Sequence, residues 1–264
     1  MSTGASTGGV GPADLDHVAI AATDTAPALR FLTGVLGGTV LSGGQAFGFR
    51  PMQVLVGDLT GGMKVELLEP WEPERNDFLA RFVARSGAGP HHLTFKVADL
   101  DVALAGARHA GFSPIGIERS DPRWQETFLH PREAFGTVVQ MAQTNEGADR
   151  AAWLAYVAAN GASGEPIWWV DPEPPTGPAA YLRRVVLGAP DPGPVLALYR
   201  DLLGGREVGG DTDEAEGTEL EWPGGGRVRI ERRADQPPGV DRLEVEGLGA
   251  PTNVLGTWFT PTDR

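Results

Sequence analysis

Residues 15–24 read LDHVAIAATD, and residues 90–99 read PHHLTFKVAD. Each stretch has the alternation of apolar and polar side chains that is typical of a half-buried strand. A helix-like run follows each one, APALRFLTGVLGG after the first and LDVALAGARHAGF after the second. An Asp or Thr cap precedes each run, and Gly-Gly or Ala-Gly ends it. The two stretches are therefore copies of one repeat, in which His17 aligns with His92.

A second pair of strands ends each copy. The first copy contains MKVELLE at residues 63–69 and the second contains GTVVQMA at residues 136–142, so Glu66 aligns with Gln140. Side chains on both sides of Glu66 and of Gln140 are apolar and belong on the opposite, helix-covered face of the sheet, as do Leu93, Phe95 and Val97 around His92. We therefore expect His17, Glu66, His92 and Gln140 on one concave face. Two imidazoles, one carboxylate and one amide oxygen suit a divalent ion such as Fe, Co, Ni, Mn or Zn.

The repeat also predicts how the chain is divided. We expect a flexible tail over residues 1–11, a metal-binding domain of two modules over 12–145, a linker over 146–179 and a truncated domain over 180–264. The linker is Pro-rich and carries a Trp168-Trp169 plug. The last domain opens with YLRRVVLGAPD at residues 181–191 and PVLALYRDLLGG at 194–205, a third copy of the pattern. A fourth copy begins with DRLEVEG, and the chain ends soon after it.

The third and fourth copies lack the candidate ligands. The positions that match His17, Glu66 and His92 are occupied by Arg184, Arg229 and Arg242. A guanidinium has only hydrogen-bond donors and cannot coordinate a cation. We expect this region to serve as a packing partner, and the alternative is that its arginines hold an anionic part of a ligand.

Composition excludes several classes of function. The 22 Lys and Arg residues stand against 35 Asp and Glu residues, for a formal net charge of −13, which disfavours nucleic acid and anionic membranes as partners. The absence of cysteine excludes disulfides, thiolate chemistry and Cys-ligated zinc. No apolar run is long enough to cross a bilayer, and the N-terminal residues do not resemble a signal peptide. We expect a cytoplasmic protein with a small-molecule substrate and a possible homodimeric state.

The remaining histidines and one further carboxylate are expected to be structural. The strand alternation points His91 away from His92, toward the helix-covered face. We expect His109 at the exposed end of a helix, where a cation suits the helix dipole, and His130 at a turn. Glu69 stands beside Pro70, where we expect a solvated strand end rather than a carboxylate behind the ligands.

Three segments resemble the vicinal oxygen chelate superfamily, which includes glyoxalase I, extradiol dioxygenases and methylmalonyl-CoA epimerase. They are VELLEP at residues 65–70, DFLARFVARSGAGPHHLTFKVADLDVAL at 77–104 and FLHPREAFGTVVQMAQ at 128–143, most similar to the epimerase branch. The resemblance implies an α+β fold in which paired βαβββ modules form a half-barrel around a divalent metal, followed here by a second, truncated region. His17, Glu66, His92 and Gln140 match its four ligand positions.

The resemblance implies an isomerase, epimerase or lyase that stabilises an enolate of a small carbonyl compound. Glu66 or a metal-bound water would move the proton, as a metal-bound glutamate does in glyoxalase-like relatives. Two differences separate this chain from epimerases. The carboxylate and the amide are exchanged between the second and fourth ligand positions, and no Asp or Glu stands between Asp24 and Asp58, where epimerases carry their base. Only Gln45, Arg50 and Gln53 are polar side chains of any reach there.

Two other functions stay open at this point. Two histidines and a carboxylate also match the facial triad of non-haem iron enzymes, which predicts an extradiol type of dioxygenase. A ligand-sequestering or resistance protein of the same fold would bind without turnover, which the missing base favours. No cluster of Arg or Lys suits the phosphates of CoA, so we expect a smaller and more apolar substrate.

Overall fold

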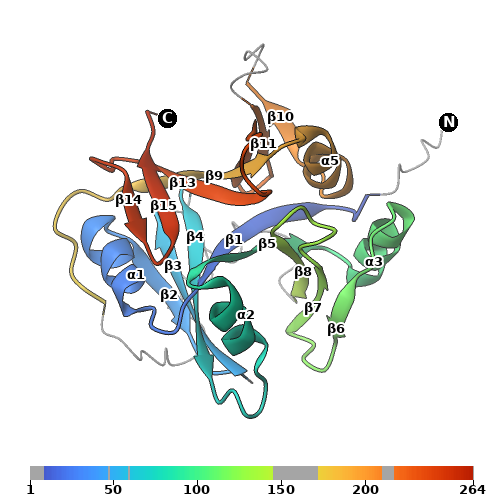
Figure 1. The fold of residues 1–264 in the computed structure, drawn as a ribbon, viewed down its shortest axis with the longest axis horizontal. Helices are drawn as coiled ribbons and strands as arrows, with labels where there is room; N and C mark the ends of the chain where they lie inside the picture. Colours follow the sequence, from blue (N-terminus) through green and yellow to red (C-terminus); the bar gives the residue numbers. More distant parts are fainter. Residues whose placement is uncertain (1–8, 47, 59, 145–171, 210–216, 264) are drawn as a thin grey trace. The chain divides into compact units, whose positions relative to one another are not determined.

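A computed structural model describes residues 9–46, 48–58, 60–144, 172–209 and 217–263 (Figure 1). The described strands form two mixed β-sheets. The first has eight strands in the order β2-β3-β4-β1-β5-β8-β7-β6, and the second has seven in the order β10-β11-β12-β9-β13-β15-β14. Each sheet contains parallel and antiparallel neighbours, such as β1 with β4 and β3 with β4 in the first.

The first sheet and its helices are built from two copies of one element order. The elements are β1 (Ala13–Ala21), α1 (Ala26–Arg30), the π-helix η1 (Phe31–Val35), β2 (Thr39–Gly43), β3 (Gly48–Val56), β4 (Met63–Trp71), α2 (Phe78–Ser86), β5 (Gly89–Val97), α3 (Leu100–His109), β6 (Ile115–Glu118), β7 (Trp124–Leu129) and β8 (Val138–Thr144). Apart from α2, each copy is a βαβββ module, so the α+β class and the paired modules predicted from the sequence are confirmed.

The second sheet repeats the pattern in shortened form. Its elements are β9 (Tyr181–Ala189), α5 (Pro192–Leu196), the π-helix η2 (Ala197–Leu202), β10 (Arg206–Val208), β11 (Thr218–Glu221), β12 (Arg227–Arg232), β13 (Gly239–Glu246), β14 (Thr252–Val254) and β15 (Thr257–Pro261). The strand order β10-β11-β12-β9-β13 parallels β2-β3-β4-β1-β5 of the first sheet. Among the described residues, no helix stands between β13 and β14. The last module is therefore truncated, as the sequence predicts.

The chain divides into two compact units that draw on both sheets. Unit 1 comprises Met1–Leu15, Leu93–Asp149 and Leu187–Gly239, and unit 2 comprises Asp16–His92, Arg150–Val186 and Val240–Arg264. The first module shares unit 2 with the shortened fourth module, and most of the second module shares unit 1 with most of the third. Each unit therefore has a core to which distant parts of the sequence contribute.

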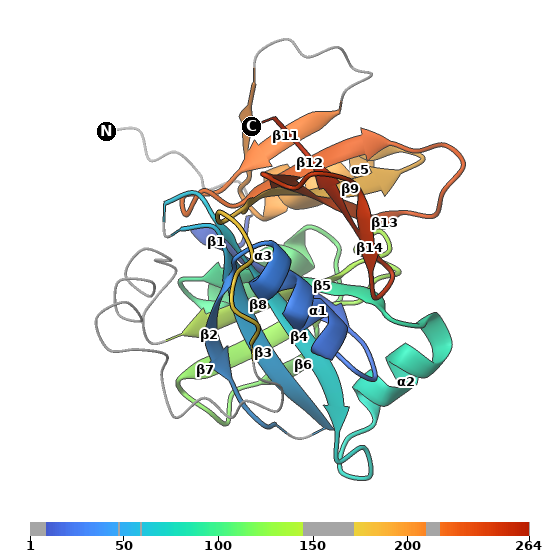
Figure 2. The ribbon, with the colours of Figure 1, turned by 90° about the vertical axis from the view of Figure 1, so that its left-hand side faces the viewer.

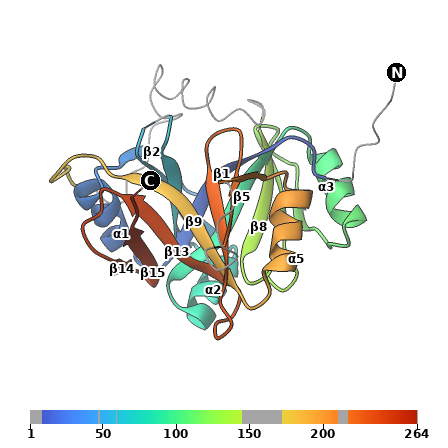
Figure 3. The ribbon, with the colours of Figure 1, turned by 90° about the horizontal axis from the view of Figure 1, so that it is seen from above.

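In unit 2, α1 lies across strands of the first module (Figure 2), and β14 and β15 lie beside α1 (Figure 3). The rings of Phe31 and Phe259 meet there, with centroids 4.9 Å apart. The segment that leads into β9 runs along η1, where the backbone N–H of Thr176 donates to the carbonyl of Gly34 at 2.8 Å. These contacts fix the helix that covers one face of the sheet and leave the other face to the candidate ligands.

In unit 1, the second and third modules share an aromatic core. The ring centroid of Phe95 on β5 lies 5.1 Å from that of Trp222 and 6.0 Å from that of Tyr199. The indole N–H of Trp222 donates to the carbonyl of Leu203 at 2.8 Å, so this buried polar atom has a partner. The apolar residues Leu93, Phe95 and Val97 of β5 are thus fully buried in this unit.

The predicted tail over residues 1–11 and linker over 146–179 lie largely outside the described residues, and the Trp168-Trp169 plug lies entirely outside them. The boundaries of the two domains stay predictions. Among the described residues, no helix is both long and apolar enough to span a membrane.

Candidate metal centre

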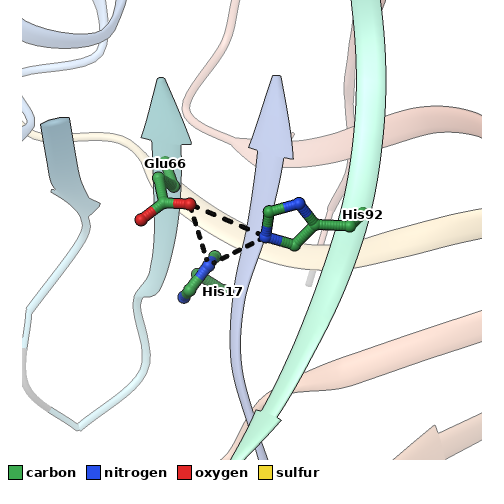
Figure 4. A group of neighbouring side chains, drawn as sticks. All are labelled: His17, Glu66 and His92. Carbon is green, nitrogen blue, oxygen red and sulfur yellow. Dashed lines mark hydrogen bonds and ion pairs between the residues drawn. The ribbon is translucent and has the colours of Figure 1, made fainter. Parts of the chain in front are cut away.

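Three side chains predicted as ligands meet in unit 2. They come from β1, β4 and β5, and Figure 4 shows them pointing toward one another. His17 Nε2 lies 3.3 Å from Glu66 Oε2, His92 Nε2 lies 3.4 Å from His17 Nε2, and His92 Nε2 lies 3.6 Å from Glu66 Oε2. The side chains are buried, with exposed fractions of 1%, 9% and 5% for His17, Glu66 and His92. Their ligand atoms form a group that could hold a metal ion.

Strand order and register explain why these residues meet. β1 lies between β4 and β5 in the sheet, and the parallel pairing of β1 with β4 places His17 beside Lys64 and Ala19 beside Glu66. Alternate residues of a strand share a face, so His17 and Glu66 project from the same side. The intervening Val18 and Val65 are fully buried on the other side. The period-2 pattern in the sequence therefore predicted the correct face.

Asp16 and Lys64 hold the ring of His17. The Nδ1 of His17 lies 2.7 Å from Asp16 Oδ2, and the Nζ of Lys64 donates to both carboxylate oxygens of Asp16 at 2.7 Å. An ionised carboxylate can only accept, so Nδ1 is the donor and Nε2 faces Glu66. Burial opposes the charged imidazolium, but the charge of Glu66 and the hydrogen bonds with Asp16 and Glu66 outweigh it and raise the pKa of His17 to about 9. A metal at Nε2 would have to displace a proton.

His92 has the opposite electrostatic character. Burial, together with repulsion from His91 and His17, holds the pKa of His92 well below its usual value. Its Nδ1 lies 2.8 Å from Nδ1 of His91, and burial lowers the pKa of His91 to about 4. A neutral His92 that donates from Nδ1 to His91 keeps the lone pair of Nε2 directed at His17 and Glu66. This is the protonation state that a metal ligand needs.

Glu66 is held in its ionised form. Burial favours the neutral acid, but the charge of His17 and hydrogen bonds from His17 and Gln53 outweigh burial and lower the pKa of Glu66. Gln53 stands directly opposite Glu66 on β3, and its Nε2 donates to Glu66 Oε1 at 3.2 Å. The carboxylate thus turns Oε2 toward the histidines and Oε1 toward Gln53.

The fourth predicted ligand, Gln140, lies on β8 in unit 1. Its Oε1 accepts from the hydroxyl of Thr94, and its Nε2 donates to Glu126. Thr94 follows His92 by two residues on β5, which is the neighbour of β8 in the sheet. Its place beside the other three ligands stays a prediction.

The three donors of unit 2 suit a divalent ion. Ligands about 2.1 Å from one ion are separated from one another by about 3.0 Å in octahedral and about 3.4 Å in tetrahedral coordination. The observed separations of 3.3, 3.4 and 3.6 Å are close to these values. Two imidazole nitrogens and one carboxylate oxygen are borderline donors that suit Fe, Co, Ni, Mn and Zn. The residues present therefore fit the metal that the sequence predicts.

His109 and His130 lie where the sequence places them, but His91 does not point away from His92, because the Nδ1 atoms of the two rings are 2.8 Å apart. His91 packs on α2, with its ring centroid 4.5 Å from that of Phe82 and 6.3 Å from that of Phe78. His109 is exposed in the last turn of α3. His130 is exposed at the turn before β8, where its Nδ1 accepts from the backbone N–H of Arg132 at 3.1 Å.

The expectation of a solvated end at Glu69 is wrong. Glu69 is buried, because β4 continues to Trp71 and pairs with β3 along its whole length. Its carboxylate accepts from the backbone N–H of Thr25 at 3.1 Å and from the Thr25 hydroxyl at 3.2 Å, and it pairs with Arg50. Glu69 therefore ties β4 to the start of α1.

The three arginines that replace the ligands contact carboxylates of their own sheet. Arg184 pairs with Glu244, and its Nη2 donates to Thr262 at 2.8 Å. Arg242 lies 2.7 Å from both Glu244 and Asp241. In unit 1, Arg229 lies 3.1 Å from Glu219. An anionic ligand would have to compete with these carboxylates.

Sequence reasoning did not find Asp16 or Lys64, and it considered Gln53 only as a candidate base. Asp16 and Lys64 are 48 residues apart and meet only through the register of β1 with β4. One weak signal was available, because Lys64 is one of only two lysines in the chain and stands two residues from Glu66.

Comparison with known proteins agrees with the fold. Residues 16–128 match the family model of the Glyoxalase/Bleomycin resistance protein/Dioxygenase superfamily. Over these residues the match agrees with the superfamily that the sequence resembles. The matched residues include His17, Glu66 and His92 and end before Gln140. No curated protein matches the chain.

Three solved structures are similar to parts or to most of this chain. A hypothetical protein of Bacillus halodurans C-125 is 28% identical and covers 52% of this chain and 98% of its own, with a TM-score of 0.45. A variant of Streptomyces coelicolor methylmalonyl-CoA epimerase in complex with 2-nitronate-propionyl-CoA is 25% identical and covers 51% and 96%, with a TM-score of 0.45. A hypothetical protein from Staphylococcus aureus covers 95% and 99% at 10% identity, with a TM-score of 0.62. The last likeness shows that the fold extends over both sheets.

Proposed function

We propose that His17, Glu66 and His92 bind a divalent metal ion, with Gln140 as the fourth ligand, in an enzyme that acts on a small carbonyl compound with neighbouring oxygens. The observation that carries the proposal is the buried triangle of Nε2, Nε2 and Oε2 atoms, with sides of 3.3 to 3.6 Å. When bound there, the ion would act as a Lewis acid for the negative charge that develops on a substrate oxygen. The reaction would be an isomerisation, an epimerisation or a lyase step.

Glu66 is the residue that we propose moves the proton. Its Oε2 faces the histidines and would bind the ion, which leaves Oε1, the acceptor of the Gln53 hydrogen bond, to take a proton from the carbon next to the carbonyl. The low pKa of Glu66 keeps it in the carboxylate form that a base requires. With Glu66 as the base, the reaction needs no Asp or Glu between Asp24 and Asp58, where the sequence has none.

The other residues around the triangle orient the ligands. Asp16 accepts from Nδ1 of His17, and His91 lies at Nδ1 of His92, so both Nε2 atoms face Glu66. Hydrogen bonds of this kind fix the orientation of a ligating imidazole. The net charge of −13 supports a small, weakly charged substrate over a polyanion. The possible homodimer and the cytoplasmic location stay predictions from sequence.

Hydrogen–deuterium exchange tests this function. Protein loaded in turn with each of the five metals is incubated in D2O with small α-hydroxycarbonyl and thiohemiacetal compounds, and NMR follows loss of the carbon-bound proton. We expect exchange that requires metal and that falls by at least about 100-fold in Glu66→Gln at full metal occupancy. Full metal occupancy with unchanged exchange in Glu66→Gln would remove Glu66 as the base.

A non-haem iron dioxygenase is the second candidate, favoured by the set of two histidines and one carboxylate. Oxygen uptake by anaerobically iron-loaded protein across a panel of catechols tests it. Catechol-dependent uptake that is lost in His17→Ala supports the dioxygenase, and its absence supports the proton-transfer reaction. Tight binding of a carbonyl compound without metal or turnover would instead indicate a sequestering protein.

A further inference from the structure

A buried ion pair lies directly behind one ligand of the triangle. The carboxylate of Asp16 accepts from Nδ1 of His17 and from Nζ of Lys64, each at 2.7 Å. The side chains of Asp16, His17 and Lys64 are each only 1% exposed. Lys64 is also the residue of β4 that pairs with His17 on β1. Two adjacent strands thus deliver one carboxylate and one ammonium to the back of the same imidazole ring.

We propose that the Asp16–Lys64 pair is a positioning device for His17, which fixes Nδ1 as the donor and directs Nε2 at Glu66 and His92. Lys64 contacts both oxygens of Asp16, which holds the carboxylate in a single orientation. Asp16 then offers Oδ2 to Nδ1 and leaves Nε2 as the ring atom that faces Glu66, 3.3 Å away. The consequence for metal binding rests on the proposed function.

Stability alone is a poor explanation of this pair. Taking two charges out of water costs about as much free energy as their attraction returns, and apolar residues of similar size often replace a buried pair at no loss. The Oδ2 atom of Asp16 also accepts from Nδ1 of His17, a contact that an ion pair with Lys64 alone would not need. Lys64 compensates the charge of Asp16, so Glu66 is the carboxylate whose charge remains for an ion at the triangle. A carboxylate that fixes an imidazole in this way strengthens metal binding by about 10- to 100-fold.

Two double variants separate positioning from stability. Asp16→Leu/Lys64→Met removes both charges and the acceptor that Asp16 offers to Nδ1. Asp16→Asn/Lys64→Met removes both charges but keeps an amide oxygen as acceptor. Neither variant retains the ion pair, so a role limited to holding β1 against β4 would be lost equally in both. Chelator competition measures the affinity for Zn²⁺ and Co²⁺, and ¹⁵N-resolved NMR of metal-free protein detects the hydrogen-bonded Nδ1 proton of His17.

We expect the Leu variant to bind metal about 10- to 100-fold more weakly than wild type, and the Asn variant to recover most of that loss. The Nδ1 proton signal should persist in wild type and the Asn variant and vanish in the Leu variant. Equal metal affinities in the two variants would overturn the inference, as would a wild-type spectrum with no proton on Nδ1. If wild type binds no metal but the Nδ1 signal follows this pattern, the metal function fails and the positioning role stands.

Discussion

The same strand order carries two different charge arrangements in this protein. On β1, β4 and β5, His17, Glu66 and His92 bring two imidazole nitrogens and one carboxylate oxygen within 3.6 Å of one another. On the matching strands β9 and β13, Arg184 and Arg242 share one carboxylate, Glu244. Guanidiniums only donate, so the second arrangement is satisfied by the protein itself, while the first has donor atoms that suit a cation. The repeat fixes where charged side chains stand, and the residue types decide which region can do metal chemistry.

The largest expected effect comes from removing the anionic ligand. Glu66→Leu should weaken metal binding by more than about 100-fold, above the range expected for a residue that only supports a ligand. Arg229→Gln, at the position that the repeat aligns with Glu66, is the matched control and should leave the affinity unchanged. Chelator competition measures both. Similar losses in the two variants would mean that the regions do not differ as proposed.

Breaking the arginine cluster should affect stability instead of metal binding. Arg184 and Glu244 are both 7% exposed, so Arg184→Met leaves a buried carboxylate with Arg242 as its remaining partner. We expect the free energy of unfolding to fall by about 3 kcal/mol. Urea unfolding measures this change, and metal titration of the folded variant serves as the control. An unchanged unfolding midpoint, or a loss of metal affinity, would contradict the comparison.

A smaller effect is expected from the residue that holds Glu66. Gln53→Leu removes the hydrogen bond from Nε2 to Glu66 Oε1 and should weaken metal binding by about tenfold. Gln45 is an exposed glutamine between β2 and β3, and it supplies the control variant Gln45→Leu, which should bind metal as wild type does. If both variants kept wild-type affinity, Gln53 would have no part in positioning the carboxylate.

The smallest effect concerns the caps of two repeat-related helices. Asp99 accepts from the backbone N–H groups of Asp101 and Val102 at the start of α3, and Asp191 accepts only from that of Gly193 at the start of α5. Asp99→Ala should lower the free energy of unfolding by about 1 kcal/mol, and Asp191→Ala by about half as much. Urea unfolding compares the two. A larger loss in Asp191→Ala would show that the C-terminal copy depends more on its cap.

Much of the fold could be predicted from the repeat, because strand alternation and helix caps are local properties of the sequence. The strand predicted over residues 15–24 is β1, and the cap predicted before the second helix is Asp99, which bonds two N–H groups. The first helix was less predictable. It continues from α1 into a π-helix over Phe31–Val35. The spacing of apolar residues did not predict this, because it does not determine which carbonyl accepts from each backbone N–H.

The meeting of the three candidate ligands could be predicted, and the residues that hold them in place could not. His17, Glu66 and His92 occupy repeat-related positions, and each lies on the face that the alternation predicts. The pairing of β1 and β3 with β4 brings Asp16, Lys64 and Gln53 to their places. The sequence of one strand does not show which residues of another strand it will pair with. Glu69 was misjudged for the same reason, because its burial depends on the full length of the β3–β4 pairing.

We expect the buried triangle to bind a metal and to require both of its histidines for this. Mass spectrometry of protein purified without a His tag measures this directly, in wild type, in His17→Ala/His92→Ala and in His109→Ala/His130→Ala. The last variant removes the same number of histidines from exposed sites. We predict near-stoichiometric metal in wild type and in the exposed-site variant, and none in His17→Ala/His92→Ala. Metal absent from wild type even after reconstitution, or retained when His17 and His92 are removed, would contradict the account.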